Sequence, residues 1–99
     1  MSMHPSEAEG FELDEANEGK LSAHRILGWE VYEVFENRPI WIPNKRSGSG
    51  DYKMVGRNDG GRRLTIIVEV KEHTKQLRPI TGWPSSQSDI TLYDRRRRR

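Results

Sequence analysis

The sequence contains no cysteine among its 99 residues, which excludes a disulfide framework and any metal site built on thiolates. The lack of cysteine fits a reducing compartment, and we expect a cytoplasmic protein. No apolar run approaches the roughly 18 residues of a membrane-spanning helix, and the N-terminus lacks the apolar core of a signal peptide. The three histidines lack metal-ligand spacing to one another. We therefore expect no metal, no other cofactor and no membrane partner.

Apolar residues are also scarce, at 32% of the chain, and charged residues make up another 32%. A chain of this length forms one domain with a single modest core. We predict a flexible leader at residues 1–10, one folded domain at residues 11–94 and a basic tail at residues 95–99.

The small net charge of +2 conceals an asymmetry between two parts of the chain. Residues 1–37 carry nine acidic and two basic side chains, whereas residues 38–99 carry six acidic and fifteen basic ones. A cationic body favours a polyanionic partner, most often nucleic acid. The alternative is that the two parts neutralise each other in the folded molecule.

Two helices are expected in the N-terminal part of the chain. The first covers residues 14–24, where Asp14 is a suitable N-cap and acidic side chains follow it in the first turn. The second begins at Gly28 or Trp29 and ends at residue 36, before a proline. Its apolar residues recur at helical spacing. We expect the glutamates of its other face, Glu30, Glu33 and Glu36, to face water.

The strongest structural signal is a β-hairpin centred on residues 58–61. Apolar and polar residues alternate on both sides of this Asn-Asp-Gly-Gly turn, where glycine supplies the positive φ of a tight reversal. If Arg57 lies opposite Arg63, the alternation sorts the two strands into two faces. The apolar face then holds Tyr52, Met54, Leu64, Ile66 and Val68, and the polar face holds Lys53, Arg57, Arg63 and Thr65. The sequence therefore predicts a sheet with an apolar side and an open, cationic side.

Two further strands complete the predicted sheet. One covers residues 40–42 and is followed by a loop of turn-forming residues. The other covers residues 77–81, and Pro79 places it at an edge or interrupts it, because proline cannot donate to a β-ladder. A short helix at residues 85–93 follows. The predicted fold class is thus α+β, with two N-terminal helices, a small antiparallel sheet of about four strands and a short C-terminal helix.

Several short motifs run in a characteristic order along the chain. They are Phe11-Glu12-Leu13-Asp14-Glu15-Ala16-Asn17, His24-Arg25-Ile26, Glu30-Val31, Val34-Phe35, Gly56-Arg57, Gly61-Arg62-x-Leu64, Arg78-x-Ile80-Thr81 and Tyr93. In order and spacing they resemble the BrnT-type ribonuclease toxins. Arg25 stands where that family usually has glycine, and Trp83 stands where an arginine often follows the last strand.

The resemblance implies a RelE-like α+β fold and a metal-independent endoribonuclease toxin of a bacterial type II toxin–antitoxin pair. The implied partners are RNA and a cognate, DNA-binding antitoxin protein, in a homodimer or a toxin–antitoxin hetero-oligomer. Because of the departures at Arg25 and Trp83, an alternative function from another class stays open. This alternative is a non-catalytic module that binds nucleic acid or protein through the same surface.

The candidate catalytic residues suit a phosphate under in-line attack by a ribose 2′-hydroxyl. Guanidinium groups grip phosphate in a bidentate manner, which favours Arg57, Arg63 and Arg78, converging on one side of the sheet. The alternative for these three is a solvated strand face. His24 suits proton transfer near neutral pH, or it interacts with the last carbonyls of its helix. Tyr93 stacks on a base, donates a proton, or docks the last helix.

Further basic and aromatic residues are candidates for RNA binding outside the reacting phosphate. The basic ones are Lys53, Arg62, Arg95, Arg96 and Arg97, of which Arg62 also suits a turn. The arginine tail is typical of a disordered clamp on a polyanion, with an acidic partner or the acidic leader as alternative targets. Trp41 and Trp83 suit base stacking or, alternatively, anchoring in a core or an interface.

Overall fold

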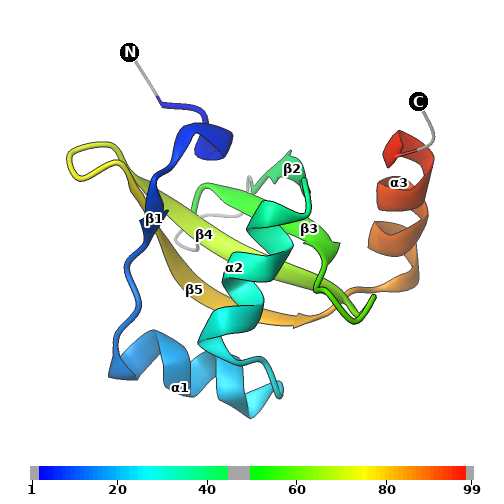
Figure 1. Ribbon diagram of the computed structural model, residues 1–99, viewed down its shortest axis with the longest axis horizontal. Helices are drawn as coiled ribbons and strands as arrows, with labels where there is room; N and C mark the ends of the chain where they lie inside the picture. Colours follow the sequence, from blue (N-terminus) through cyan, green and yellow to red (C-terminus); the bar gives the residue numbers. More distant parts are fainter. Residues whose placement is uncertain (1–2, 45–49, 98–99) are drawn as a thin grey trace.

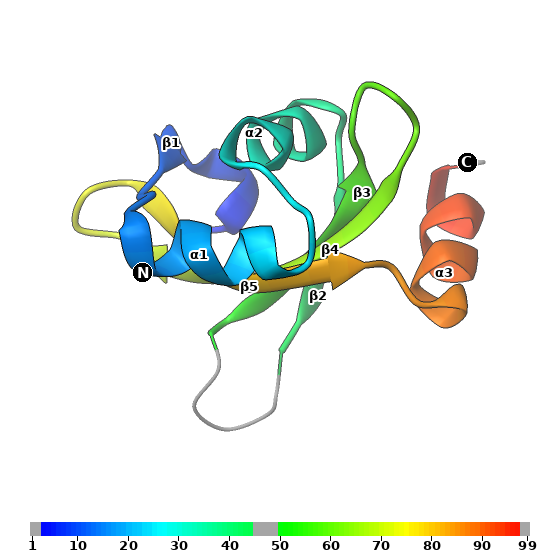
Figure 2. The same cartoon turned by 90° about the horizontal axis from the view of Figure 1, so that it is seen from below.

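A five-stranded mixed sheet forms the centre of the computed structural model, which describes residues 3–44 and 50–97 (Figure 1). The strands are β1 (Gly10–Phe11), β2 (Ile40–Pro43), β3 (Tyr52–Arg57), β4 (Arg63–Lys71) and β5 (Gln76–Pro84), in the spatial order β1-β5-β4-β3-β2. The helices are α1 (Glu15–Ala23), α2 (Gly28–Glu36) and α3 (Gln87–Arg97). Helices α1 and α2 cover one face, and α3 lies beside the end of the β3–β4 hairpin (Figure 2). The predicted α+β class is confirmed.

Helix α1 begins where the sequence predicts because Asp14 caps it. The Asp14 carboxylate accepts a hydrogen bond from the Asn17 N–H, and the Asn17 side-chain oxygen accepts one from the Asp14 N–H, both at 2.9 Å. The helix ends in a turn in which the Ile26 N–H donates to the Leu21 carbonyl at 3.0 Å, the pattern of a Schellman motif. This turn holds Arg25 at a φ of 60°, in the left-handed region that favours glycine.

Helix α2 spans the predicted residues and turns Val31 and Val34 into the core. One prediction for it is wrong, since Glu30 is buried instead of facing water. The Glu30 carboxylate accepts hydrogen bonds from the Leu27 N–H at 2.9 Å and from the Asn58 side-chain amide at 2.8 Å. It therefore ties the start of α2 to the β3–β4 hairpin.

The hairpin has the register that its alternation predicts, with Arg57 opposite Arg63. Gly61 has a φ of 90° in the turn, a conformation that glycine adopts at little cost. The predicted apolar face packs beneath α1 and α2 in one core cluster. This cluster is built on Leu21, Ile26, Val31, Val34, Met54, Leu64, Ile66 and Val68, with Tyr52 packed against it. The apolar side of the sheet is confirmed.

The opposite face of the sheet differs from the open cationic surface that we predicted. Helix α3 packs on it, and Tyr93 is buried there beside Ile40 and Val55. Thr65 is buried as well, and its hydroxyl donates to the Asp89 carboxylate of α3 at 3.0 Å. The predicted cationic face is therefore interrupted by a helix.

The N-terminal segment that we predicted to be a flexible leader is folded over its described part. Pro5 is buried in the 3-10 helix Pro5–Glu7, and β1 pairs in parallel with the first two residues of β5. The sheet is therefore mixed and has one strand more than predicted. Residues 1 and 2 lie outside the described residues.

Strand β5 is longer than predicted and accommodates Pro79 in both of the ways expected. Beyond its first two residues β5 has no partner on the β1 side within the described chain, so it forms an edge there. Next to Pro79 the ladder also shifts register, since Val68 pairs with Pro79 and Ile67 with Thr81. The register shift leaves Ile80 as the extra residue of a bulge.

Helix α3 also extends beyond its predicted end and includes Arg95, Arg96 and Arg97. The first part of the predicted tail is thus helical, and residues 98–99 lie outside the described residues. In the part of the chain that is described, no helix combines the length and apolar character needed to cross a membrane.

Candidate nucleic-acid interface

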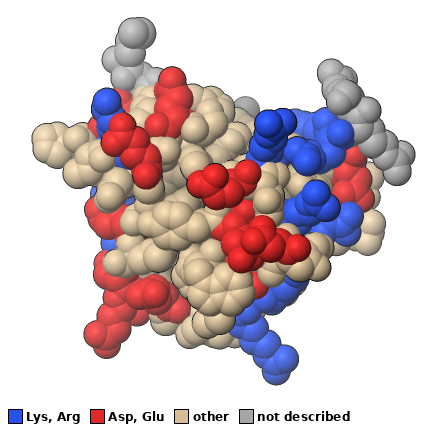
Figure 3. Space-filling view, in the orientation of Figure 1, with Lys and Arg blue, Asp and Glu red and all other residues tan. Residues whose placement is uncertain are grey.

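A hollow of about 440 Å³ opens at the hairpin end of the sheet, beside the second half of α3. It is lined by Arg57, Arg63, Tyr93, Asp94 and Arg97, and we call it the arginine hollow. Figure 3 shows lysine and arginine side chains gathered over α3 at the upper right, whereas acidic side chains gather at the lower left and over the middle of this face. Acidic side chains of the N-terminal part also pair with basic ones of the remainder, since Glu30 contacts Arg62, and Glu12 and Asp14 contact Arg78. A concave, cationic surface concentrates anions such as phosphate.

The two strand arginines of the hollow differ in their partners. Arg63 donates to the Asp94 carboxylate at 3.1 Å, with the two side chains 37% and 38% exposed. Arg57 is exposed, and within the described residues its guanidinium makes no hydrogen bond or ion pair. Arg57 is therefore available to an anionic ligand, whereas Arg63 already has a carboxylate partner.

Tyr93 lies between the strands and the last turn of α3. Its side chain is 3% exposed, and its buried hydroxyl has no hydrogen-bond partner among the described residues. The guanidinium carbon of Arg97 lies 5.8 Å from the centre of the Tyr93 ring, within the range of a cation–π contact. A buried hydroxyl without a partner costs about 1–3 kcal/mol. This uncompensated group therefore marks the hollow as a candidate ligand site.

Arg78 does not join the arginine hollow, so the prediction that three guanidinium groups converge is wrong. Arg78 pairs with Glu69, six positions along β4 from Arg63, which corresponds to about 20 Å of strand. Arg78 is near the start of β5, which pairs with the end of β4. Its side chain therefore lies at the end of the sheet that is away from the hairpin turn. The hollow therefore holds two of the three predicted strand arginines.

Arg78 instead forms ion pairs with the segment before α1. Its guanidinium donates to Asp14 at 2.6 Å and to Glu12 at 3.0 Å. The hydrogen bond from Arg78, followed by the backbone N–H of Asn17, lowers the pKa of the Asp14 carboxyl. The same carboxylates raise the pKa of Arg78. Arg78 therefore has a structural role, because it links β5 to the N-cap of α1.

His24 and Arg62 lie together at the end of α1, outside the arginine hollow. His24 is the exposed C-terminal cap residue, with its ring centre 6.4 Å from that of Trp83. Arg62 donates to the carbonyls of Arg25 at 2.7 Å and His24 at 3.3 Å, and it pairs with Glu30 at 3.6 Å. A cation at this position satisfies the free carbonyls at a helix C-terminus. Arg62 therefore fastens the end of α1 to the hairpin.

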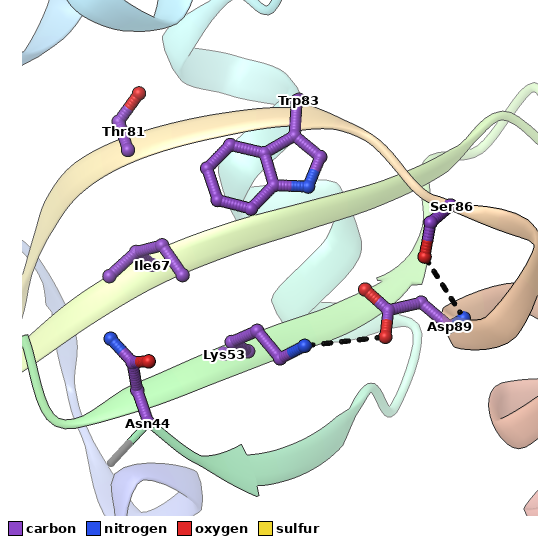
Figure 4. Close-up of a pocket in the computed structure, with 7 residues that line it drawn as sticks. All are labelled: Asn44, Lys53, Ile67, Thr81, Trp83, Ser86 and Asp89. Carbon is purple, nitrogen blue, oxygen red and sulfur yellow. Dashed lines mark hydrogen bonds and ion pairs between the residues drawn. The ribbon is translucent and has the colours of Figure 1, made fainter. Parts of the chain in front are cut away.

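A second hollow, of about 400 Å³, lies on the sheet beside the start of α3. Its lining is Asn44, Lys53, Ile67, Thr81, Trp83, Ser86 and Asp89, and we call it the tryptophan hollow. Figure 4 shows Lys53 and Asp89 facing each other across one side of it, with the Trp83 indole on the other. The Lys53 ammonium and the Asp89 carboxylate are 3.4 Å apart. Of the residues predicted to bind nucleic acid, Lys53 therefore lies in a different hollow from Arg97.

The remaining predicted residues, Arg95 and Arg96, are exposed on the last turn of α3. Sequence reasoning missed two carboxylates of the same helix, Asp89 and Asp94. The available signal for Asp89 was its place three residues after Ser86, whose hydroxyl accepts a hydrogen bond from the Asp89 N–H at 3.3 Å. That spacing indicates a helix start. It does not indicate which strand the carboxylate will face.

Within residues 3–44 and 50–97, no group of three or more histidine, aspartate and glutamate side chains is arranged to hold a metal ion. Comparison of the chain with protein-family models, with curated proteins and with solved structures found no match. The resemblance to ribonuclease toxins thus rests on the sequence motifs alone.

Proposed function

We propose that the protein binds single-stranded RNA in the arginine hollow and cleaves a phosphodiester there as a metal-independent endoribonuclease. One observation carries this proposal: the unpaired Arg57 guanidinium shares a hollow with Tyr93, whose buried hydroxyl has no hydrogen-bond partner among the described residues. A phosphate offers acceptor oxygens to both groups. Charge-assisted hydrogen bonds of this kind are the strong ones.

The reaction proposed is an internal transesterification. The ribose 2′-oxygen attacks phosphorus, the bond from phosphorus to the 5′-oxygen breaks, and the products are a 2′,3′-cyclic phosphate and a 5′-hydroxyl. Arg57 and Arg63 bind the non-bridging oxygens, where negative charge increases in the transition state. Asp94 takes the proton of the 2′-hydroxyl, and the Tyr93 hydroxyl gives a proton to the leaving 5′-oxygen.

A second candidate function is favoured by the ion pair between Arg63 and Asp94. A carboxylate in the hollow repels phosphate and occupies one of its two strand arginines. His24, the other residue predicted to transfer a proton, also lies elsewhere. These features favour a module that binds RNA without cleaving it.

A protein partner is part of this proposal, because a ribonuclease toxin must be held inactive. The partner class implied by the motif resemblance is a DNA-binding antitoxin, in a hetero-oligomer or together with a toxin homodimer. Large apolar side chains on and next to α2 support a protein-binding surface: Leu27, Trp29 and Tyr32 are 50%, 58% and 41% exposed. Exposed apolar patches mark such surfaces. A neighbouring gene for a small DNA-binding protein that suppresses toxicity on co-expression is the expected finding.

Incubation of the purified protein with end-labelled single-stranded RNA in EDTA tests the primary proposal. We expect cleavage with cyclic phosphate ends, and we expect Arg57→Gln to lose it. Arg78→Gln is the matched control, since this strand arginine lies outside the hollow, and it should retain cleavage. Intact RNA together with salt-dependent binding supports the second candidate. The absence of both cleavage and binding contradicts both.

A further inference from the structure

The tryptophan hollow has an aromatic wall and two opposite charges on one side, and we propose that it binds the guanine base of an RNA chain. This inference deepens the proposed function and rests on it in one respect, namely that the base belongs to an RNA held in the arginine hollow. The recognition itself depends on three other side chains. They are Trp83, Lys53 and Asp89.

Trp83 supplies a flat apolar surface for a base. It is half-buried on β5, and the indole shows its broad face in Figure 4 beside the side chains of Ile67 and Thr81. Bases stack on such surfaces with little regard to identity, because each base has a π-face. Trp83 therefore accounts for the binding of a base, and the polar side of the hollow must select which base.

Lys53 and Asp89 present a donor and an acceptor side by side. An ionised carboxylate only accepts hydrogen bonds and can accept two in parallel, whereas an ammonium group only donates. Guanine carries two adjacent donors, N1–H and the N2 amino group, next to the acceptor O6. The carboxylate thus accepts both donors while the ammonium donates to O6. Adenine, cytosine and uracil each offer a carboxylate only one donor group on that edge.

The Asp89 carboxylate is held in place before any base arrives. It accepts from the Thr65 hydroxyl at 3.0 Å, and it is 7% exposed. Hydrogen bonds in such a poorly solvated position are strong. The contact with Lys53, at 3.4 Å, is beyond the usual range of a good hydrogen bond. Lys53 can therefore turn to a base without breaking a short contact.

The two hollows are spaced for one RNA chain. Asp89 and Tyr93 are four positions apart on α3 and face the sheet from successive turns, which corresponds to a rise of about 6 Å. A base in the tryptophan hollow and a phosphate in the arginine hollow therefore belong to the same or to adjacent nucleotides. A binding site for one base next to the scissile phosphate would give the cleavage a sequence preference.

Fluorescence anisotropy tests this inference with labelled hexauridylates that carry one central guanosine, inosine or adenosine and whose 2′-hydroxyls are methylated to prevent cleavage. For the wild-type protein we expect guanosine to bind on the order of tenfold tighter than adenosine. Inosine should fall between them, because it keeps N1–H and O6 and lacks the N2 amino group. Asp89→Asn, which keeps an acceptor for Thr65, should abolish the preference, and Lys53→Gln should reduce it.

Two further variants separate this site from the arginine hollow. Arg57→Gln should weaken all the oligonucleotides alike and leave the guanosine preference intact. Lys71→Gln removes a lysine that pairs with Glu69 at 3.3 Å on the same strand face, and it should change neither affinity nor preference. Thermal denaturation of each variant checks that it is folded.

Titration of the wild-type protein with GMP and with AMP, followed by NMR, separates failure of this inference from failure of the proposed function. Selective GMP binding that Asp89→Asn abolishes and Lys53→Gln reduces supports the guanine site even if no RNA is bound. Equal affinity for guanosine and adenosine oligonucleotides, with equal GMP and AMP binding, contradicts the proposed guanine site. That result does not contradict the proposal that the protein binds RNA. A preference that survives both variants contradicts the guanine site as well.

Discussion

Arg57 lies directly opposite Arg63 across strands β3 and β4, so two like charges face each other on one side of the sheet. Directly opposed like charges destabilise a strand pair. Arg63 is compensated by Asp94 at 3.1 Å, whereas Arg57 has no such partner within the described residues. The free protein therefore carries a local cost at this position, which a bound anion would relieve.

Replacement of Arg57 by glutamine should separate stability from function. We expect the variant to be more stable than the wild type by a few tenths of a kcal/mol, within the ~0.2–1 kcal/mol of opposed pairs. Its RNA affinity should fall, and the slope of log affinity against log salt concentration should decrease by about 1. Urea denaturation and salt-dependent binding measure the two effects. A clear loss of stability would show that Arg57 has a structural role instead.

Replacement of Tyr93 by phenylalanine should leave the fold intact or stabilise it slightly. The variant removes a buried hydroxyl that has no partner within the described chain, so its desolvation cost disappears. RNA cleavage should fall about 10²-fold or more, as expected for loss of a proton donor, and RNA binding should weaken because one hydrogen bond to the phosphate is lost. Thermal denaturation and single-turnover cleavage measure these effects. Destabilisation by more than about 1 kcal/mol would mean that the hydroxyl is hydrogen-bonded after all.

Replacement of Asp14 by asparagine should reveal a pH-dependent contribution to stability. Because its hydrogen bond from Arg78 lowers the pKa of Asp14 from 3.8 in the folded state, the ionised carboxyl stabilises the fold at pH values above 3.8. This contribution is lost as the pH falls through the lowered, folded-state pKa. Asparagine still caps the helix, so the substitution mainly removes the charge.

The expected result is that the asparagine variant melts below the wild type near neutral pH and that the two melting temperatures converge in acid. Glu15→Gln provides the control, since it removes a carboxylate from the first turn of the same helix without touching Arg78. A gap between Asp14→Asn and wild type that stays constant over the whole pH range would contradict this account.

Replacement of Arg25 by glycine should stabilise the protein. Arg25 has a φ of 60° in the turn after α1, and a side chain in the left-handed region costs about 1–2 kcal/mol. We expect a gain of about 1 kcal/mol, measured by urea denaturation. The same substitution at Arg95, inside α3, should instead destabilise by about 1 kcal/mol, because glycine is unfavourable within a helix. Destabilisation at Arg25 would show that its side chain makes a contact worth more than the strain.

The register of the hairpin could be predicted because a shift by one residue would move Met54 and Ile66 out of the core. Strand β1 could not be predicted, since two residues show no periodicity and their partners lie in β5, at the other end of the chain. The sequence predicts too short an α3 because an arginine run is typical of a disordered tail, although arginine is a good helix former. Local signals thus predicted the local elements and missed the distant pairing.

In the candidate site, too, the locally encoded features could be predicted from the sequence and those that depend on distant contacts could not. Arg57 and Arg63 share a hollow because the hairpin register sets them opposite each other, and that register is encoded locally. The position of Arg78 depends on the length of the turn before β5 and on the bulge at Ile80. Neither feature could be predicted from the sequence. The roles of Asp89 and Asp94 depend on the angle at which α3 docks on the sheet. Docking geometry is a property of the assembled core.

The parallel contact between β1 and β5 has a consequence for synthesis on the ribosome. Glu12, directly after β1, meets Arg78 of β5 across 66 positions of sequence, so the first strand has no partner until most of the chain has left the exit tunnel. The arginine hollow needs α3, which emerges later still. The arginine hollow is therefore among the last parts of the described fold to assemble during synthesis.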